Sequence, residues 1–324
     1  MNRRQFVATA SMALFAQTTG LQASTPLPAE DLKILLGYPA GGAADFIARL
    51  IAAQINKTLG RSIIIVNQPG ASGLITINNL RRGTPDGKTV ALIPITGAVM
   101  MPLVKPAAAF DSLNDVSPIV TAVSFALGFV ASNSTGIKTW NEFQEWAKKQ
   151  PGEVLCGGPS VGSISHLFCA MMKQTLGINF QYVPYRGSGE TNQALMGGHL
   201  PFAVNVTPDL VEPSRTGRLQ VLAMSSKERD ATLPSIPTFV ELGFPSLHCD
   251  AWFGFFAPPG LPVPMITAWN EAINHALADA ELQKAIQKLG YKVRGGLPAA
   301  LKGEIESDQA RWKAVVTTAG IKMD

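Results

Sequence analysis

Short β-forming runs alternate with amphipathic stretches along most of this chain from residue 32 onward. The first runs are residues 32–38, 62–66 and 89–93, and the stretches between them are 46–59 and 74–80. Within 46–59, apolar residues recur at intervals of three and four, as on the buried face of a helix. Strands linked by helices in this order predict a mainly parallel sheet with right-handed connections.

A second series of the same kind follows, so the chain of 324 residues is predicted to form two α/β lobes. Its predicted strands are 127–131, 154–157, 180–183 and 202–206, and its predicted helices are 140–149, 165–176 and 190–196. A further strand at 252–256 precedes three predicted helices, at 265–277, 280–289 and 301–318. We expect this last part to contain no further strand and to pack back onto the first lobe.

The N-terminus has the pattern of a cleaved signal peptide. Arg3 and Arg4 precede an apolar centre at residues 6–15, and small and polar residues continue to Ala23. The apolar segment is too short to span a bilayer stably. Because Arg3-Arg4 also resembles a twin-arginine export signal, both export routes stay open. We expect residues 1–23 to be removed and the mature protein to reside in the periplasm.

The composition argues against several kinds of ligand. The formal net charge falls by two, from +4 to +2, when Arg3 and Arg4 leave with the signal peptide, and only 7% of residues are aromatic. Neither the basic patch nor the stacking surface of a nucleic-acid-binding protein is therefore predicted. The four histidines and three cysteines show no metal-ligand spacing. We expect no metal and no cofactor.

The cysteines are Cys156, Cys169 and Cys249, an odd number that cannot pair completely within one chain. Apolar neighbours of Cys156 and Cys169 favour buried free thiols. A single disulfide is the alternative in an oxidising compartment, and the sequence does not decide between the two.

Each predicted lobe contains a glycine-rich turn between a strand and a helix. The first turn is Tyr38-Pro39-Ala40-Gly41-Gly42-Ala43-Ala44-Asp45, and the second runs from Gly157 through Ser160 to Ser163. The first N–H groups of a helix have no partner within the helix, and glycines let a ligand approach them closely, so such turns bind anions. Two turns facing across a cleft could hold a dicarboxylate. The alternative is that Gly41 and Gly42 only permit a tight turn, with Asp45 capping the helix.

One enzyme motif also matches. Gly158-Pro159-Ser160-Val161-Gly162 fits the G-x-S-x-G pattern, and Asp209, Asp230 and His248 follow in the order found in α/β-hydrolases. A nucleophilic Ser160 would need a histidine within hydrogen-bonding distance and an acid behind it, which sequence order does not establish. A secreted serine hydrolase or esterase is therefore an alternative function. In the competing interpretation Ser160 is a ligand donor or a helix cap.

Several motifs, in order and spacing over the whole mature chain, resemble one known family. They are Tyr38-Pro39-Ala40-Gly41-Gly42, Asn67-Gln68-Pro69-Gly70-Ala71-Ser72-Gly73, Thr84-Pro85-Asp86-Gly87, Val183-Pro184-Tyr185-Arg186-Gly187, Leu233-Pro234-Ser235-Ile236-Pro237-Thr238 and Trp252-Phe253-Gly254. In these motifs the chain resembles the tripartite tricarboxylate transporter receptors, also called the Bordetella uptake gene family of periplasmic binding proteins. Each motif alone is weak, and the combination is specific.

The resemblance implies a two-lobed α/β fold of type II periplasmic binding proteins. Each lobe would be a mixed, mostly parallel sheet flanked by helices, with the ligand cleft between the lobes and two strands crossing between them. Lobe one would comprise residues 24–125 plus 252–324, and lobe two residues 126–251. The implied ligand contacts in lobe one are Tyr38, Ala40, Gly41, Gly42, Ala43, Ala44, Ala71, Ser72, Gly73 and Thr96. Those in lobe two are Ser160, Val161, Gly162, Ser163, the segment from Tyr185 to Gly187, Asn205 and Thr207.

Two positions depart from the family pattern. Asn205 stands where the family commonly has Asp, and Thr207 stands where an apolar residue is usual. Exchanging a carboxylate for an amide removes a negative charge and supplies an N–H donor. We hypothesise from this exchange that the pocket accepts a more anionic or differently shaped acid than relatives selective for an α-amino group. The alternative is that Asn205 is a hydrogen-bonded polar residue at a strand end.

The function that the resemblance implies is capture of a small organic carboxylate by hinge closure, for membrane subunits of a tripartite tricarboxylate-type transporter. We expect a monomer without enzymatic activity and without nucleic-acid partners. A receptor that feeds a sensor kinase would use the same closure, so the sequence leaves that alternative open. The sequence does not identify the carboxylate.

Overall fold

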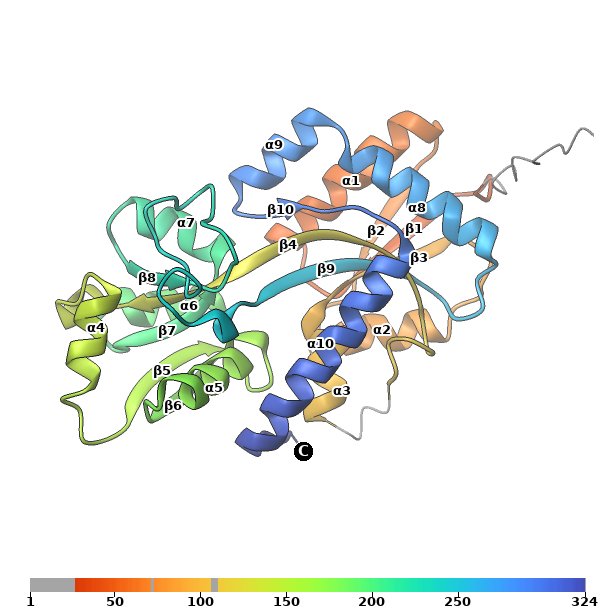
Figure 1. Cartoon of the computed structure of the whole chain (residues 1–324). Coiled ribbons are helices and arrows are strands. Elements are labelled where there is room, and N and C mark those ends of the chain that lie inside the picture. Colours follow the sequence, from red (N-terminus) through yellow and green to blue (C-terminus); the bar gives the residue numbers. More distant parts are fainter. Residues whose placement is uncertain (1–26, 71–72, 106–109, 324) are drawn as a thin grey trace, which may run out of the picture.

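Two long strands connect the two halves of the molecule. The computed structural model describes residues 27–70, 73–105 and 110–323. Strands β4 (Ser117–Ala131) and β9 (Asp250–Ala257) run antiparallel to each other between the two halves, which we call lobe one and lobe two (Figure 1). Within the described residues, the strands join into a ten-stranded sheet of order β2-β1-β3-β9-β4-β7-β5-β6, and β8 and β10 also pair with β4.

Lobe one begins with the predicted strand–helix series. Its first elements are β1 (Leu32–Leu36), α1 (Ala43–Leu59), β2 (Ile63–Asn67), α2 (Leu74–Arg81), β3 (Thr89–Pro94), a π-helical turn (Thr96–Met100) and α3 (Met101–Val104). β1 pairs in parallel with both β2 and β3. Helix α1 buries Ile47, Ile51 and Ile55, and it ends at Gly60, whose left-handed φ of 62° suits glycine. The apolar periodicity thus predicted this helix, which begins three residues earlier than expected.

Lobe two repeats this architecture. Its elements are α4 (Trp140–Ala147), β5 (Val154–Pro159), α5 (Ile164–Leu176), β6 (Phe180–Tyr185), α6 (Ser188–Met196), β7 (Phe202–Val206), α7 (Thr207–Arg215) and β8 (Gln220–Met224), with single 3-10 turns at Asn133–Thr135 and Pro245–Leu247. β5 pairs in parallel with β6 and β7. Neither α7 nor β8 was predicted. Pro213 lies inside α7, and a proline normally argues against a helix interior.

The sheet is parallel only where strand–helix–strand units were predicted. Every strand pairing of β4 and of β9 is antiparallel, and the two strands run between the lobes in opposite directions. β4 pairs with β9 up to Ala126 and with β7 from Leu127 onward, so it changes partner in mid-strand. The predicted lobe boundaries, 125/126 and 251/252, lie beside this change. As boundaries between bodies that move separately they remain a prediction.

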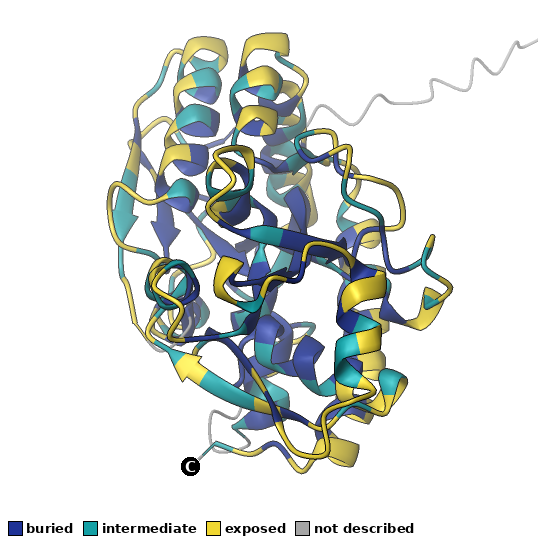
Figure 2. Ribbon diagram, turned by 90° about the vertical axis from the view of Figure 1, so that its left-hand side faces the viewer, coloured by how far each residue is buried: buried dark blue, intermediate teal, exposed yellow. Residues whose placement is uncertain are grey.

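The C-terminal part returns to lobe one through α8 (Val263–Leu277), α9 (Ala280–Lys288) and α10 (Pro298–Ala319). The expectation that it contains no strand is wrong, because β10 (Lys292–Val293) pairs with β4. Helix α10 packs on β4 and also on α5 of lobe two, so it does not belong to lobe one alone (Figure 1). Figure 2 shows the result: buried strands lie between helices whose outer faces are exposed.

Buried polar groups tie the C-terminal helices to the rest of lobe one. The indole N–H of Trp269 on α8 donates to the carbonyl of Gly87 (2.8 Å). The indole N–H of Trp252 on β9 donates to a carboxylate oxygen of Asp308 on α10 (2.8 Å). Such bonds fix the register of a helix on a sheet, because a buried donor left without a partner costs stability.

The cysteines are free thiols in the core of the protein. Cys156, Cys169 and Cys249 are buried and unbridged, which confirms the interpretation as buried thiols. The predicted signal peptide lies outside the described residues. Among the helices of the described part, none combines the length and hydrophobicity needed to cross a membrane.

The buried carboxyl of Asp308 predicts a pH dependence of stability. Burial raises the pKa of Asp308 to about 6, although its bond with Trp252 acts in the opposite direction. The folded protein therefore holds this proton more tightly than the unfolded chain does, and the free energy of unfolding falls as pH rises from about 4 to 6. The difference corresponds to about 3 kcal/mol above pH 6. Asp308→Asn removes the charge, so we expect it to raise the free energy of unfolding at pH 7.5 by roughly 1–3 kcal/mol.

Urea unfolding at pH 4.5 and pH 7.5 checks this expectation. The gain from Asp308→Asn should be largest at pH 7.5 and small at pH 4.5. The control is Asp31→Asn, which removes an exposed carboxylate. A gain of equal size at both pH values would contradict the assignment to Asp308 ionisation.

Candidate functional site

A cavity of about 420 Å³ lies between the lobes, where the parallel strands of both lobes end. Ligands of open α/β sheets bind outside the carboxyl ends of such strands. Eight of the predicted site residues line it: Tyr38, Gly42, Ala43, Ala44, Thr96, Ser160, Ser163 and Gly187. A second hollow, of about 480 Å³, lies beside α4 and the C-terminal end of α5. Helix C-termini carry partial negative charge, so the first cavity is the better anion site.

The described residues among the other predicted ones do not line this cavity. Ala71 and Ser72 are outside the described residues. The cavity lining does not include Ala40, Gly41, Gly73, Val161, Gly162, Tyr185, Asn205 or Thr207. The lining includes further residues that were not predicted, namely Pro39, Pro94, Ile95, Phe125, Pro159, Ile164, Ser165, Ser188, Val206, Asp209, Phe253 and Tyr291, together with Arg186 from the predicted 185–187 segment.

The loop before α1 is held in place from behind by Asp45. Its carboxylate accepts hydrogen bonds from the Gly41 N–H (3.0 Å), from Arg49 (2.8 Å) and from the Asn67 amide (2.9 Å). The bond from Arg49 is the main reason that the pKa of Asp45 is lowered to about 2. Gly42, the N-cap residue of α1, supplies no side-chain cap, so Asp45 braces the loop and leaves the first N–H groups of α1 to the cavity.

The loop before α5 is capped by Ser163. Its hydroxyl accepts from the His166 N–H (3.3 Å) and donates to the Pro159 carbonyl (2.6 Å). Ser160 was considered as the cap, but Ser163 has that role. Behind the loop, Gly158 has no room for a side chain, because a Cβ there would lie 2.5 Å from the Tyr182 hydroxyl oxygen.

Ser165, in the first turn of α5, has a buried hydroxyl without a partner. Its side-chain oxygen makes no hydrogen bond within the described part of the chain, the residue is 1% exposed, and it lines the cavity. Buried hydroxyls are rarely left unpaired, because their desolvation costs about 1–3 kcal/mol. Ser165 therefore offers a donor to a ligand in the cavity. Sequence analysis missed it because it looks like any polar residue inside an amphipathic helix.

The residues of a serine hydrolase are not assembled around Ser160. No histidine is among the described residues that line the cavity. Asp230 accepts bonds from the backbone and hydroxyl of Thr232, and His248 lies at the end of a 3-10 turn outside the cavity. His166 follows the motif, but its Nδ1 accepts a bond from the Gly162 N–H (3.1 Å) and its ring stacks on Tyr182. Burial lowers the pKa of His166, which fits this role as a neutral acceptor.

Asn205 and Thr207 support the cavity from behind. The Asn205 amide donates to the Ser188 carbonyl (3.2 Å) and to the Asn192 side chain (2.9 Å), and its oxygen accepts from the Val206 N–H (3.0 Å). Thr207 donates to the Ala126 carbonyl (2.8 Å). Both residues are fully buried, so the alternative interpretation of Asn205 as a hydrogen-bonded residue at a strand end is confirmed. The ligand preference inferred from Asn205 has no contact to support it.

Helices α6 and α7 complete the lobe-two side of the cavity. Gly187 and Ser188 come from the start of α6, while Val206 and Asp209 come from the start of α7. Together with α1 and α5, these helices direct their N-terminal ends toward one cavity. The summed partial positive charge of helix N-termini favours an anion at such a place.

Known proteins match this chain over most of its length. The model of the tripartite tricarboxylate transporter family receptor matches residues 47–321. Protein BugT of Bordetella pertussis is 28% identical over 318 residues, covering 97% of this chain and 98% of its own. The UPF0065 protein in the gbd 5′ region of Cupriavidus necator is 30% identical over 298 residues, with 89% of each chain covered.

Solved structures agree in fold. MatC from Rhodopseudomonas palustris, solved with bound malate, is 27% identical with a TM-score of 0.78, covering 90% of this chain and all of its own. The R. palustris protein Rpa4515, solved with adipate, is 26% identical with a TM-score of 0.82, covering 91% of this chain and 99% of its own. The periplasmic binding protein BugD is 25% identical with a TM-score of 0.79, covering 92% of this chain and all of its own. The fold is thus the two-lobed type II fold of periplasmic binding proteins. The chain belongs to the tripartite tricarboxylate transporter receptor family, a family of solute-binding receptors and not a class of enzymes.

Proposed function

We propose that this protein is a periplasmic receptor that captures a small organic carboxylate and presents it to membrane subunits of a tripartite tricarboxylate-type transporter. The observation that carries the proposal is the convergence of four helix N-termini, α1, α5, α6 and α7, on one cavity that is also lined by Ser165, whose buried hydroxyl has no partner among the described residues. The exported location, the monomeric state and the delivery to a transporter are parts of this proposal.

Backbone groups are the main donors in this design. The first turn of α1 in lobe one and the first turn of α5 in lobe two both line the cavity, and the first N–H groups of each helix have no partner within the helix. A carboxylate between them would accept charge-assisted hydrogen bonds, which are stronger than bonds between neutral groups. The carboxylates in the structures of MatC and Rpa4515 support this ligand class.

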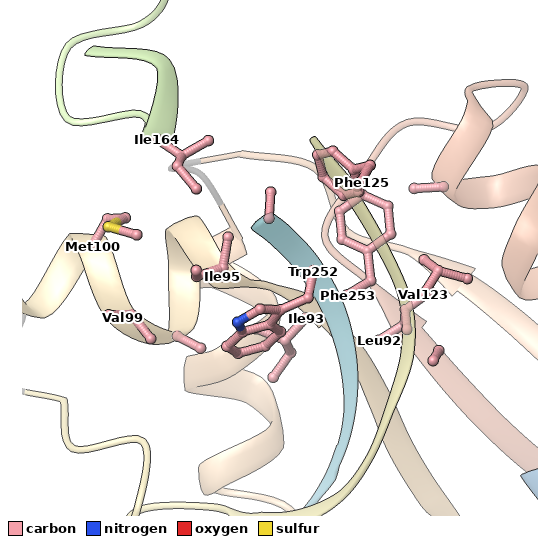
Figure 3. Close-up of a cluster of buried hydrophobic side chains, with 14 of the residues drawn as sticks. Leu92, Ile93, Ile95, Val99, Met100, Val123, Phe125, Ile164, Trp252 and Phe253 are labelled. Carbon is pink, nitrogen blue, oxygen red and sulfur yellow. The ribbon is translucent and has the colours of Figure 1, made fainter. Parts of the chain in front are cut away.

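Closure of the lobes on the ligand would use β4 and β9. These strands connect the lobes, and the change of pairing partner at Ala126 and Leu127 gives β4 a place to bend. Apolar contacts favour closure: Figure 3 shows Ile164 of α5 facing Ile95 and Met100 of lobe one, and all three are buried. A ligand that touches both lobes stabilises the closed form by its contacts to the second lobe.

Replacement of Ser165 tests the carboxylate site. Ser165→Ala removes one hydrogen bond to a charged group, so we expect the affinity for carboxylates to fall roughly 10- to 100-fold. The stability of the unliganded protein should stay the same or rise slightly, because the hydroxyl has no partner to lose. Isothermal titration calorimetry with malate and adipate, backed by thermal shifts, measures both effects.

The matched control is Ser226→Ala. Ser226 is also fully buried with an unpartnered hydroxyl, but it does not line the cavity. Its replacement should leave carboxylate affinity unchanged. Equal losses in both variants, or no thermal shift of the unmodified protein with any carboxylate, would contradict the proposed site.

An ester assay tests the hydrolase alternative. Because no histidine among the described residues lines the cavity beside Ser160, we expect the protein not to hydrolyse short-chain p-nitrophenyl esters above the rate in buffer. The Ser160→Ala variant is the control. Turnover by the unmodified protein that disappears in the variant would refute the receptor assignment.

A further inference from the structure

Asp209 places a carboxylate in a cavity that is otherwise arranged for an anion. It lies in the first turn of α7, and it lines the cavity together with one other charged side chain of the described residues, Arg186. Solvent reaches Asp209 through the open cleft, and the surrounding lobes partly desolvate its carboxylate. This desolvation raises the pKa of Asp209.

No cation within the described residues compensates Asp209. The guanidinium of Arg186 lies 3.7 Å from Glu190, and its side chain is 95% exposed. The polar neighbour of the Asp209 carboxylate is the Ser188 hydroxyl, which is neutral. A carboxylate in a cleft with no cation beside it is a favourable partner for a ligand group that brings a hydrogen-bond donor or a positive charge.

Four aromatic rings form a wall of the same cavity. We call this set, Tyr38, Phe125, Phe253 and Tyr291, the aromatic wall. Its ring centroids are 5.2 Å apart for Phe125 with Phe253 and with Tyr291, and 5.6 Å apart for Tyr38 with Phe253. Figure 3 shows Phe125 and Phe253 beside each other on β4 and β9. All four residues line the cavity.

Asp209 and the aromatic wall line the same cavity. Burial is the main cause that raises the pKa of Tyr38 and of Tyr291, and in both cases the negative charge of Asp209 is the next. A carboxylate beside aromatic faces is the combination that attracts an ammonium group, through an ion pair and through the negative faces of the rings. A second carboxylate of a ligand at this place would instead meet a like charge.

We propose that the cavity selects carboxylates that also carry a positively charged nitrogen, with Asp209 and the aromatic wall as the specificity determinants. This inference rests on the proposed function. The carboxylate of the ligand would lie at the N-terminal ends of α1 and α5 near Ser165, and the nitrogen would lie toward Asp209. The preference is the reverse of the one that Asn205 suggested from the sequence.

Two ligand pairs test the selectivity by isothermal titration calorimetry. In the first, 5-aminopentanoate is compared with adipate, which has a second carboxylate in place of the ammonium. In the second, 4-(trimethylammonio)butanoate is compared with 5,5-dimethylhexanoate, in which an uncharged carbon atom replaces the positively charged nitrogen. We expect the unmodified protein to bind the nitrogen-bearing member of at least one pair 10-fold or more tightly than its partner.

Asp209→Asn should remove this preference. We expect a loss of 10-fold or more in affinity for the zwitterion and an unchanged or higher affinity for adipate. The matched control is Glu212→Gln, which removes a charge from the exposed side of the same helix, away from the cavity, and should leave both affinities unchanged. If Asp209→Asn does not fold, the ligand pairs with the unmodified protein still decide the question.

The outcomes separate this inference from the proposed function. A preference below 10-fold in both pairs, tighter binding of adipate and of the uncharged analogue, or a preference that Asp209→Asn leaves intact, would overturn the inference and leave the carboxylate receptor standing. Absence of binding by all four probes would overturn the inference, and absence of binding by every carboxylate tested would contradict the proposed function as well.

Discussion

The backbone hydrogen bonding of β4 is the constraint on which the rest of the molecule depends. One half of this strand pairs with β9 and the other half with β7, so the sheets of both lobes continue into each other. Within each lobe, helical crossovers between parallel strands place the helix N-termini at the carboxyl ends of the strands. Because β4 sets the position of one lobe against the other, it also brings those N-termini together at one cavity.

The cavity combines two opposite electrostatic features. Partial positive charge comes from the ends of four helices that point at it, and a full negative charge comes from Asp209 beside an aromatic wall. Asp45 does not cancel the positive end of α1 inside the cavity, because Arg49 and Asn67 hold its carboxylate behind the loop. The positive and the negative feature therefore lie on different residues. A cavity with separated charges distinguishes the two ends of a ligand as well as its size.

Local patterns predicted the repeated elements but not the long-range contacts. Apolar periodicity identified α1 and α5, because each buries one face whose spacing is visible in the sequence, and β7 was predicted although consecutive residues of it are buried. It missed α7, where Pro213 argues against a helix, and β10, which is two residues long and depends on pairing with β4. The glycine-rich turns indicated residues 42–44 and Ser163, since a helix start near glycines has a recognisable composition.

Other site residues left no such signal. Phe253 and Tyr291 reach the cavity from parts of the chain more than two hundred residues after Tyr38. Phe253 belongs to the Trp252-Phe253-Gly254 motif, but the motif did not indicate a place in the cavity, and nothing near Tyr291 distinguishes it from a core aromatic. Asp209 was noticed only as a candidate hydrolase acid. Its role depends on which helix end faces the cavity, and that is set by tertiary structure.

Lobe one is built from an N-terminal and a C-terminal part of the chain, and this also determines the order in which the two lobes can fold. Lobe two is continuous, whereas the core of lobe one needs Trp269 against Gly87 and the buried Trp312 of α10. A chain that emerges from its N-terminus can form the strands and most helices of lobe two while lobe one still lacks α8, α9 and α10. The half of the cleft that contains α1 is therefore completed last, after α10 has been synthesised.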